Sequence, residues 1–360
     1  MSNRYDDIKV FLGKAGWGSA EHLPVQGDAS ARRYIRLSLG ERKAILMDAP
    51  KGSDFPAEPE GASSDERRAL GYGAMARLAG SEPAAFLAIA QELTQRGYSA
   101  PKILDSNSEH GFILLEDLGH DDFARIIKLD PLKETALYEA AVDCLAAIYR
   151  STFPKEFTYR DMAWRVRDYD QTALMAEMTL MSEWYAPDTG VALSDEALLE
   201  WDTIWNAPFE RLKAHASGLA LRDFHAENIF WLPQRAGVAN VGLIDFQDAL
   251  WTHPAYDLAS LLEDIRRDVD EVLVEPLKQR FCEKAGLAYN EDFRAAYAVM
   301  GAQRSTKLLG FPVRADKKYG KPQYRVLLPR VKRHLNLSLK HPALNEVKDW
   351  YARYVPEVLS

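Results

Sequence analysis

The sequence predicts an α+β chain of two lobes, with an antiparallel sheet in the N-terminal lobe and a mainly helical C-terminal lobe. Short β-like runs separated by turn residues fill the first third of the chain, and apolar residues at helical spacing dominate after Gly119. The 360 residues are enough for two domains of ordinary size. We therefore expect an N-terminal lobe over residues 1–118 and a C-terminal lobe over residues 119–360.

The predicted sheet rests on two pairs of β-like runs. Residues 33–39 and 43–48 flank the turn Gly40-Glu41, so they are expected to form a hairpin. Residues 102–104 and 112–115 are joined by a polar turn and form the second pair. Together they predict an antiparallel sheet.

Between these pairs, residues 52–81 are rich in Gly, Pro, Ser, Ala and charge, and predict an irregular insertion. A helix is expected over residues 84–95, ending before Gly97.

The remainder of the chain is predicted to consist of helices and two short strands. The helices are expected near residues 131–149, 170–185, 194–216, 257–285, 290–309 and 325–339, and the strands near residues 229–232 and 238–246.

Composition narrows the class of protein. Hydrophobic residues make up 47% and charged residues 27%, a globular balance, and no apolar run is long enough to predict a membrane span. The polar first ten residues do not resemble a signal peptide. Cys144 and Cys282 lie far apart in predicted helices, as expected for buried thiols. We expect a cytoplasmic protein without membrane partners; the sequence does not indicate its oligomeric state.

Charge is unevenly distributed along the chain. The net charge of −8 argues against nucleic-acid binding. Residues 304–340 nevertheless carry eleven Lys or Arg and only Asp316 as an acid, a local net charge of +10. This segment predicts either solvated helix faces or an anion-binding surface.

Several motifs are absent or lack their structural setting. Residues 71–76 fit the G-x-G-x-x-A pattern but follow no strand. There is no phosphate-binding G-x-x-x-x-G-K-[ST] loop, no G-x-S-x-G turn, and no spacing for structural zinc. Alternation of Asp223, His225 and Glu227 would suit a transition metal only if the segment were extended. These exclusions leave one informative constellation.

That constellation is Asp223, Asn228 and Asp245. Asp223 and Asn228 lie five residues apart before a short predicted strand, and Asp245 comes near the end of the next. This equipment is typical of the catalytic loop and metal-binding Asp-Phe motif of protein kinases. Asp223 can accept the proton of an attacking hydroxyl, while Asn228 and Asp245 offer Mg²⁺ hard oxygen ligands. The alternative is that Asp and Asn here only form turns.

Residues 221–228 resemble the loop of aminoglycoside phosphotransferases and choline kinases, which usually reads His-Gly-Asp-x-x-x-x-Asn. Leu221 replaces the His. The Pro-x-x-Asp-Leu-Ala run that starts at Pro254 also matches this family, where Asp257 would cap a helix and brace the catalytic loop. The resemblance implies a two-lobe protein-kinase-like fold, ATP as co-substrate and Mg²⁺ as cofactor.

Further short segments match one group within this family. They are residues 27–34, 46–50, 183–185, 301–304, 307–310, 320–322 and 328–330. In these segments the chain resembles the cell-wall sugar kinases that phosphorylate N-acetylmuramate and N-acetylglucosamine at the anomeric hydroxyl. The resemblance implies a kinase for an N-acetylated amino sugar. The alternatives are a kinase for another small alcohol, such as an aminoglycoside or choline-like compound, and an inactive nucleotide-binding regulatory module.

The resemblance also implies a nucleotide site. Backbone groups of Glu116 and Leu118 are expected to bond the adenine, and the loop with Gly27 and Ser30 is expected to fold over the phosphates. Met47 stands where the family has a phosphate-binding lysine.

A cation from Arg32 or Arg33 is expected to compensate for the missing lysine. The alternative for both is a solvated arginine at the strand edge. Glu92, the candidate partner of such a lysine, is expected to be merely exposed.

The sugar site is less specific. Glu183 beside Trp184 suits a sugar ring, and Gln303 with Arg304 suits an anionic sugar. Trp184 in the hydrophobic core is the alternative. The basic segment favours an acidic or neutral sugar over a polycationic aminoglycoside.

Overall fold

The computed structural model describes residues 4–25, 32–50 and 55–360. Gly27 and Ser30, expected in the nucleotide site, lie outside the described residues. Contacts divide the chain into two compact units. The first contains residues 1–129, 154–166 and 227–248, and the second contains residues 130–153, 167–226 and 249–360.

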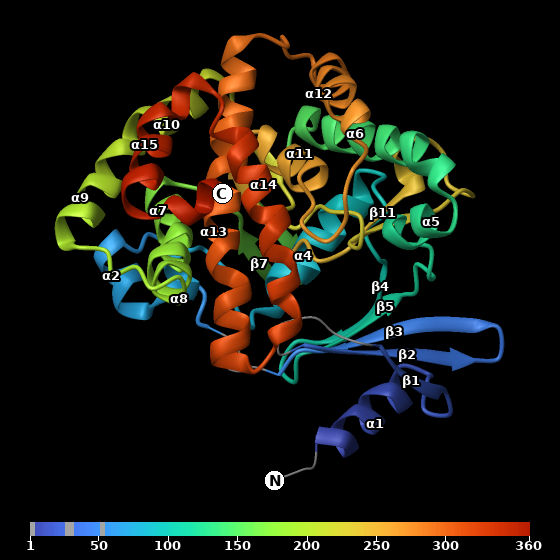
Figure 1. Cartoon of the computed structure of the whole chain (residues 1–360). Helices are drawn as coiled ribbons and strands as arrows, with labels where there is room; N and C mark the ends of the chain where they lie inside the picture. Colours follow the sequence, from blue (N-terminus) through green and yellow to red (C-terminus); the bar gives the residue numbers. More distant parts are fainter. Residues whose placement is uncertain (1–3, 26–31, 51–54) are drawn as a thin grey trace. The chain divides into compact units, whose positions relative to one another are not determined.

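The first unit is built on a five-stranded antiparallel sheet (Figure 1). The strand order is β1-β2-β3-β5-β4, and both hairpins expected from the sequence are present. The strands are β1 (Glu21–Val25), β2 (Arg33–Leu39), β3 (Arg42–Asp48), β4 (Ile103–Asn107) and β5 (Phe112–Glu116).

Helices and two small hairpins complete this unit. The helix α1 covers one face of the sheet, burying Phe11 and Leu12 against Leu37, Leu46 and Leu114. Period-two alternation places the last three on one face. The other elements are α1 (Arg4–Lys14), α2 (Ser64–Leu70), α3 (Tyr72–Met75), α4 (Pro83–Gln95), α5 (Phe123–Leu129), β6 (Glu156–Tyr159), β7 (Met162–Arg165), β10 (Ile229–Trp231) and β11 (Val241–Leu243).

The hairpin β10–β11 belongs to the first unit although it lies late in the sequence. The Leu243 N–H donates to the Ser99 carbonyl (2.9 Å), and the Trp231 N–H donates to the Asp121 carbonyl (2.8 Å). These backbone bonds tie both strands to segments of the first unit. The units therefore do not follow a single cut after residue 118.

The expected irregular insertion is wrong for residues 64–75, which form α2 and α3. Ser63 and Glu66 make a capping box: the Ser63 hydroxyl accepts from the Glu66 N–H, and the Glu66 carboxylate accepts from the Ser63 N–H. The Ser-x-x-Glu signal was present in the sequence but lay within a Gly- and Pro-rich stretch.

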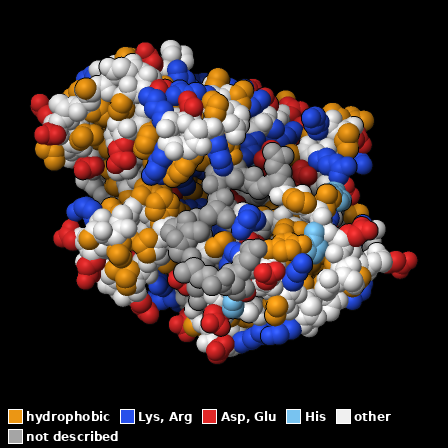
Figure 2. Space-filling view, turned by 90° about the horizontal axis from the view of Figure 1, so that it is seen from below, with side chains coloured by type: hydrophobic (Ala, Val, Ile, Leu, Met, Phe, Trp, Pro, Cys, Tyr) orange, Lys and Arg blue, Asp and Glu red, His pale blue; other side chains and the backbone are white. Residues whose placement is uncertain are grey.

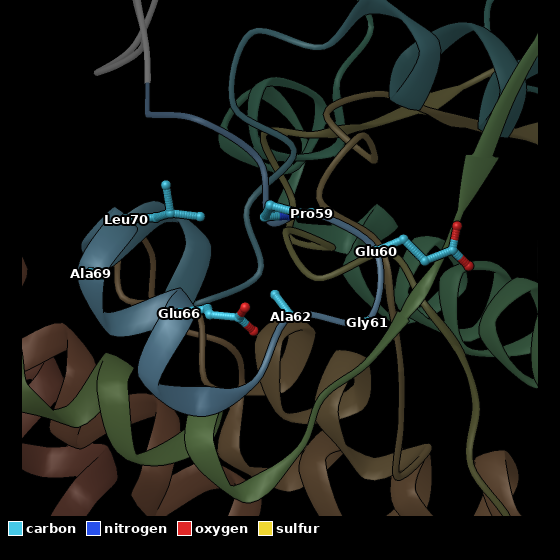
Figure 3. Close-up of a pocket in the computed structure, with 7 residues that line it drawn as sticks. All are labelled: Pro59, Glu60, Gly61, Ala62, Glu66, Ala69 and Leu70. Carbon is cyan, nitrogen blue, oxygen red and sulfur yellow. The ribbon is translucent and has the colours of Figure 1, made fainter.

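A shallow hollow lies beside α2, between this helix and the preceding loop (Figure 3). Glu60 points away from the helix and pairs with Arg165 at 2.7 Å. None of the residues expected in the active site lines the hollow. Its lining residues are Pro59, Glu60, Gly61, Ala62, Glu66, Ala69 and Leu70.

The second unit is mainly helical and is organised around the long helix α13, with α14 beside it (Figure 1). The expected helix near residues 290–309 continues to Tyr319 and ends at Gly320, whose φ of 63° suits a left-handed cap. Pro312 does not end it, because packing outweighs local propensity in this buried helix.

The other elements of the second unit are mainly helices. They are α6 (Glu134–Arg150), β8 (Arg167–Asp168), α7 (Gln171–Leu180), the π-helical turn η2 (Met181–Tyr185), α8 (Ala186–Asp188), α9 (Asp195–Ile204), α10 (Asn206–Arg211), β9 (Gly218–Ala220), β12 (Leu250–Thr252), α11 (Ala255–Leu262), α12 (Glu271–Ala285), α14 (Leu328–Ser338) and α15 (Asn345–Tyr354). The expected helical regions of the second unit are present, except that the region 257–285 is interrupted between α11 and α12. The strands β8, β9 and β12 and the helix α15 were not expected from the sequence.

Close packing of α13 explains one glycine of the sugar-kinase-like segments. A Cβ atom at Gly310 would lie 1.8 Å from the Leu180 carbonyl oxygen, at the end of α7. Alanine normally stabilises a helix relative to glycine, but this overlap involves backbone that cannot rotate away. Gly310 therefore allows α13 to approach α7 closely.

We predict that Gly310→Ala lowers the free energy of unfolding by about 1–3 kcal/mol, because the helices must separate. Gly13→Ala in α1 is the matched control, since no atom lies within 4 Å of the added Cβ. It should be neutral or stabilising by up to about 1 kcal/mol. Urea unfolding measures both, and equal effects would contradict the close approach.

Candidate active site

The hairpin β10–β11 brings two of the predicted residues together. Ile229 pairs with Leu243, so Asn228 and Ile244 lie opposite each other at the open end, and the Ile244 N–H donates to the Asn228 carbonyl (3.2 Å). Asp245 is the next residue in the chain after Ile244. Its Oδ2 atom lies 3.4 Å from Nδ2 of Asn228.

Asp245 adopts an unusual backbone conformation, with φ of 61°. Aspartate tolerates the left-handed region better than most residues, but the surroundings must hold it there. Phe246 is fully buried and stacks on Phe86 of α4, with 5.0 Å between ring centroids. Gln247 donates from Nε2 to Oδ1 of Asp245 (2.8 Å). These neighbours fix the carboxylate, whose side chain remains 39% exposed.

Asn228 and Asp245 fit a Mg²⁺ ion. Both offer hard oxygen atoms, and a rotation of the Asn228 amide turns its carbonyl oxygen toward the aspartate. In the part of the chain that the structure describes, no group of three or more His, Cys, Asp or Glu forms a metal cage. A pair of ligands suits Mg²⁺, which commonly takes its other ligands from phosphate and water.

An arginine lies beside the same carboxylate. Nη1 of Arg32 is 3.7 Å from Oδ1 of Asp245, and the side chain of Arg32 is only 11% exposed. Arg32 also bonds the hydroxyl of Tyr34, and burial together with the charge of Asp245 raises the pKa of Tyr34 to about 12. Met47, opposite Tyr34 in the β2–β3 pair, is buried at 2% exposure.

Arg33 has different surroundings from Arg32. Its Nη2 atom lies 3.1 Å from Oδ2 of Asp48, which Arg4 also pairs with, and the Arg33 side chain is 65% exposed. Of the two arginines considered for the phosphates, the structure brings Arg32 to Asp245. The expectation that Glu92 is merely exposed is wrong, because its side chain is 15% exposed and pairs with Arg96, the residue that follows α4.

The segment after β5, residues 117–119, is fixed by an ion pair and hydrogen bonds with Arg36. Arg36 forms two hydrogen bonds with the carboxylate of Asp117 (2.7 and 3.0 Å) and donates to the Gly119 carbonyl (2.7 Å). Arg36 comes from β2. Its partner was not identifiable from the sequence, because the two residues are 81 positions apart.

The two residues expected to bond adenine lie in this segment. The Glu116 N–H donates to the Lys102 carbonyl (2.8 Å), so a bond from Glu116 to a base has to use its carbonyl oxygen. The Glu116 carboxylate pairs with Arg235 (2.6 Å). A side chain of Leu118 packs against Gly242 of β11, where an added Cβ would meet it at 3.1 Å.

The loop with Asp223 lies in the second unit, and hydrogen bonds from its backbone to Asp257 fix its position. The buried carboxylate of Asp257, in α11, accepts hydrogen bonds from the N–H groups of Leu221 (2.6 Å) and Arg222 (2.9 Å). The expected bracing role of Asp257 is thus confirmed. No side-chain cap of α11 accompanies it. Burial raises the pKa of Asp257 to about 7, with a further contribution from the charge of Asp223.

Arg222 occupies the position where the related families have glycine. Its φ of 77° is strained for a residue with a side chain. Its buried guanidinium pairs with Glu177 of α7, which also accepts from Lys307 (2.6 Å) and from the hydroxyl of Tyr169. Burial alone would raise the pKa of Glu177, but the charges of Arg222 and Lys307 outweigh it and lower this pKa to about 2. The cluster fixes Arg222 next to Asp223.

The four residues expected in the sugar site fall into two groups. Glu183 is exposed in the π-helical turn η2, and Trp184 is partly buried against the core of the second unit. Gln303 is fully buried, donating to Tyr169 and the Leu174 carbonyl, and Arg304 is buried beside Ser260. Their contacts are typical of core residues.

We predict that Glu177→Gln lowers the free energy of unfolding by about 3–5 kcal/mol, because it leaves the buried Arg222 and the partly buried Lys307 without their shared carboxylate. Glu210→Gln is the matched control. Glu210 pairs with Lys213 on the surface, where both side chains are mostly exposed. Its loss should cost less than about 1 kcal/mol in urea unfolding.

The pH dependence of the same variant provides a second measurement. The Glu177 pKa falls from 4.5 unfolded to about 2 folded, so its stabilisation is present above pH 4.5 and is lost as the pH falls toward 2. Between pH 5 and pH 3 the wild type should lose about 2 kcal/mol that Glu177→Gln does not lose. Equal slopes for both proteins would contradict the ionised cluster.

Comparison with known proteins identifies the family of this chain. Residues 21–297 match the phosphotransferase enzyme family. An N-acetylmuramate/N-acetylglucosamine kinase of Caulobacter vibrioides is 40% identical over 352 residues, covering 96% of this chain and 95% of the relative. A kinase of the same name from Pseudomonas aeruginosa is 30% identical over 348 residues, covering 94% of this chain and 90% of the relative.

A solved structure shows the same fold at low sequence identity. The choline/ethanolamine kinase family protein of Mesorhizobium loti has a TM-score of 0.57 and 13% identity, covering 97% of this chain and 99% of that one. The expected kinase-like fold, with an antiparallel N-terminal sheet and a helical C-terminal region, is therefore confirmed. With its family match over most of its length, this chain belongs to the phosphotransferase enzyme family.

Proposed function

We propose that this protein is an ATP- and Mg²⁺-dependent kinase that phosphorylates the anomeric hydroxyl of an N-acetylated amino sugar. The observation that carries the chemistry is the pairing of Asn228 with Asp245 at the end of the β10–β11 hairpin (3.4 Å). The choice of sugar is supported by two relatives named as N-acetylmuramate/N-acetylglucosamine kinases, which this chain matches over nearly its whole length.

In this proposal Asp223 accepts the proton of the anomeric hydroxyl. The hydroxyl oxygen forms a bond to the γ-phosphorus of ATP, and the bond from that phosphorus to the β,γ-bridging oxygen breaks, releasing ADP. Asn228 and Asp245 would hold Mg²⁺, which when bound would supply positive charge to the phosphates. Asp257 and the Glu177–Arg222 pair hold the loop that carries Asp223, so they act through its position.

The nucleotide residues remain part of the proposal. We assign the adenine to the Glu116 carbonyl and the Leu118 N–H, and the phosphates to the loop that includes Gly27 and Ser30. Buried Met47 offers an apolar surface on β3. We assign the N–H that donates to adenine to Leu118, because the Glu116 N–H already donates to the Lys102 carbonyl.

The sugar residues are proposed with a distinction between them. Glu183 is exposed and is the better candidate for a direct bond to a sugar hydroxyl, with Trp184 beside it. Buried Gln303 and Arg304 are proposed to support the site from the core.

The basic segment gives little further support for an acidic sugar. At least five of its eleven cations pair with carboxylates in the second unit, including Asp188 and Asp268. On the face shown in Figure 2, Lys and Arg are interspersed with Asp and Glu. The excess charge is thus partly offset, and the prediction of solvated helix faces fits better than an anion-binding surface.

We propose a cytoplasmic location, where ATP is available and where Cys144 and Cys282, both buried and free, would stay reduced. Among the described residues, no helix is long and apolar enough to cross a membrane. The proposed partners are the nucleotide and the sugar, without nucleic acid.

Sugar-dependent ADP release tests the function. The wild type should release ADP with N-acetylmuramate or N-acetylglucosamine and Mg²⁺, and EDTA should abolish the release. Asp223→Ala should lower kcat by about 1,000-fold or more, because both proton acceptance and orientation of the hydroxyl are lost. Binding of ATP to this variant should stay within about threefold of wild type.

Asp161→Ala is the matched control, because Asp161 is exposed in the turn between β6 and β7. It should retain wild-type turnover. If the wild type releases no ADP with either sugar, with choline or with an aminoglycoside, the inactive regulatory module is favoured. Full turnover of Asp223→Ala would mean that another group accepts the proton.

A further inference from the structure

Arg32 lies on the same sheet face as Met47. Arg32 comes just before β2, and side chains two residues apart along extended backbone share a face, which places it with Tyr34. Tyr34 pairs directly with Met47 of β3. The uncharged Met47 of β3 therefore shares its sheet face with a cation, Arg32, which lies just before β2.

The contacts of Arg32 direct its guanidinium to the metal-binding carboxylate. Nη1 lies 3.7 Å from Oδ1 of Asp245, and Nη2 lies 3.5 Å from the Gly80 carbonyl oxygen. The Tyr34 hydroxyl supplies a further hydrogen bond. Residues from three separate parts of the first unit thus surround a side chain that is only 11% exposed.

The geometry of this ion pair allows exchange of partners. A strong bond between arginine and carboxylate has a nitrogen–oxygen distance of about 2.7–2.9 Å, so 3.7 Å is a loose contact. The Asp245 carboxylate is also partly exposed, which weakens the pair further. Arg32 can therefore leave Asp245 at low cost when a stronger anion arrives.

A nucleoside triphosphate is such an anion. ATP with one Mg²⁺ keeps about two negative charges, and phosphoryl transfer depends on cations that neutralise them. If Asp245 turns to Mg²⁺, the guanidinium loses its carboxylate partner and meets the phosphate oxygens that share that ion. Arginine is well suited to this contact, because it donates several N–H groups in one plane.

Arg33 is not equivalent to Arg32, although it is next in the chain. Successive side chains of a strand point to opposite faces. Arg33 pairs with Asp48, its cross-strand partner, on the other face, and Arg4 pairs with the same carboxylate. The two neighbours thus have separate anionic partners.

We propose that Arg32 is a nucleotide-binding residue that pairs with Asp245 in the free protein and moves to the phosphates of Mg²⁺-bound ATP. This inference rests on the proposed kinase function. It assigns the cationic contact to one residue and predicts competition between Arg32 and the metal ion for Asp245.

Calorimetric binding of a non-hydrolysable ATP analogue with Mg²⁺ tests the first part. Arg32→Met should raise its Kd about 10- to 100-fold, because charged hydrogen bonds to phosphate are lost. Arg32→Lys should recover most of the affinity through its retained charge. Adenosine, which has no phosphate, should bind all variants equally. Arg33→Met should change the analogue's Kd less than about threefold.

Binding of Mn²⁺ alone, followed by electron paramagnetic resonance, tests the competition. Arg32→Met should bind Mn²⁺ about fivefold more tightly than wild type, since the Arg32 guanidinium no longer competes with the metal for Asp245. A damaged fold cannot produce tighter metal binding with weaker nucleotide binding. Arg42→Met is the surface control; Arg42 stacks on Trp17 and should behave as wild type in both experiments.

Analogue binding to Arg32→Met within about threefold of wild type would overturn the assignment, as would an equal loss of adenosine binding. Unchanged or weaker Mn²⁺ binding would overturn the competition. These are binding measurements, so they do not depend on turnover. A wild type that binds nucleotide but releases no ADP would contradict only the kinase function, whereas one that binds no nucleotide would contradict both.

Discussion

Asn228 and Asp245 can meet only because β10 and β11 pair in one register. A shift of one residue would turn every side chain of the hairpin to the other face and separate the two polar groups. The first unit fixes this register from both edges, through backbone bonds to Ser99 and Asp121. Buried Phe246 then holds the strained backbone of Asp245 by stacking on Phe86. The proposed metal-binding pair, Asn228 and Asp245, therefore depends on packing that lies outside the motif itself.

The loop that carries Asp223, in the second unit, is held by a buried ion pair and by backbone hydrogen bonds. Arg222 replaces a glycine of the related families yet keeps a positive φ, so its side chain has to be held by strong partners. Glu177 provides that hold, and Asp257 fixes the backbone of the same loop with two hydrogen bonds. Charge and backbone bonding together position Asp223, where the related families rely on the freedom of glycine.

The sequence was sufficient for the main strands and most helices, because hydrophobic periodicity is a local signal. The Asp-x-x-x-x-Asn spacing is local as well, and the catalytic and metal-binding roles that it suggests for Asp223, Asn228 and Asp245 stay predictions. The capping box of Ser63 and Glu66 was also local, but a Gly- and Pro-rich context obscured it. Contacts between distant segments had no such signal. The pairing of Arg36 with Asp117, and the choice of Arg32 over its neighbour for Asp245, required the register of the sheet.

We propose that this chain transfers a phosphoryl group to the anomeric oxygen of an amino sugar. Phosphorus NMR of the product formed from ATP, Mg²⁺ and N-acetylglucosamine is the decisive experiment. We expect a phosphomonoester whose phosphorus couples to the anomeric proton of the sugar, formed in equal amount with ADP. A product whose phosphorus couples only to the C6 protons, or ADP accompanied by inorganic phosphate alone, would contradict it.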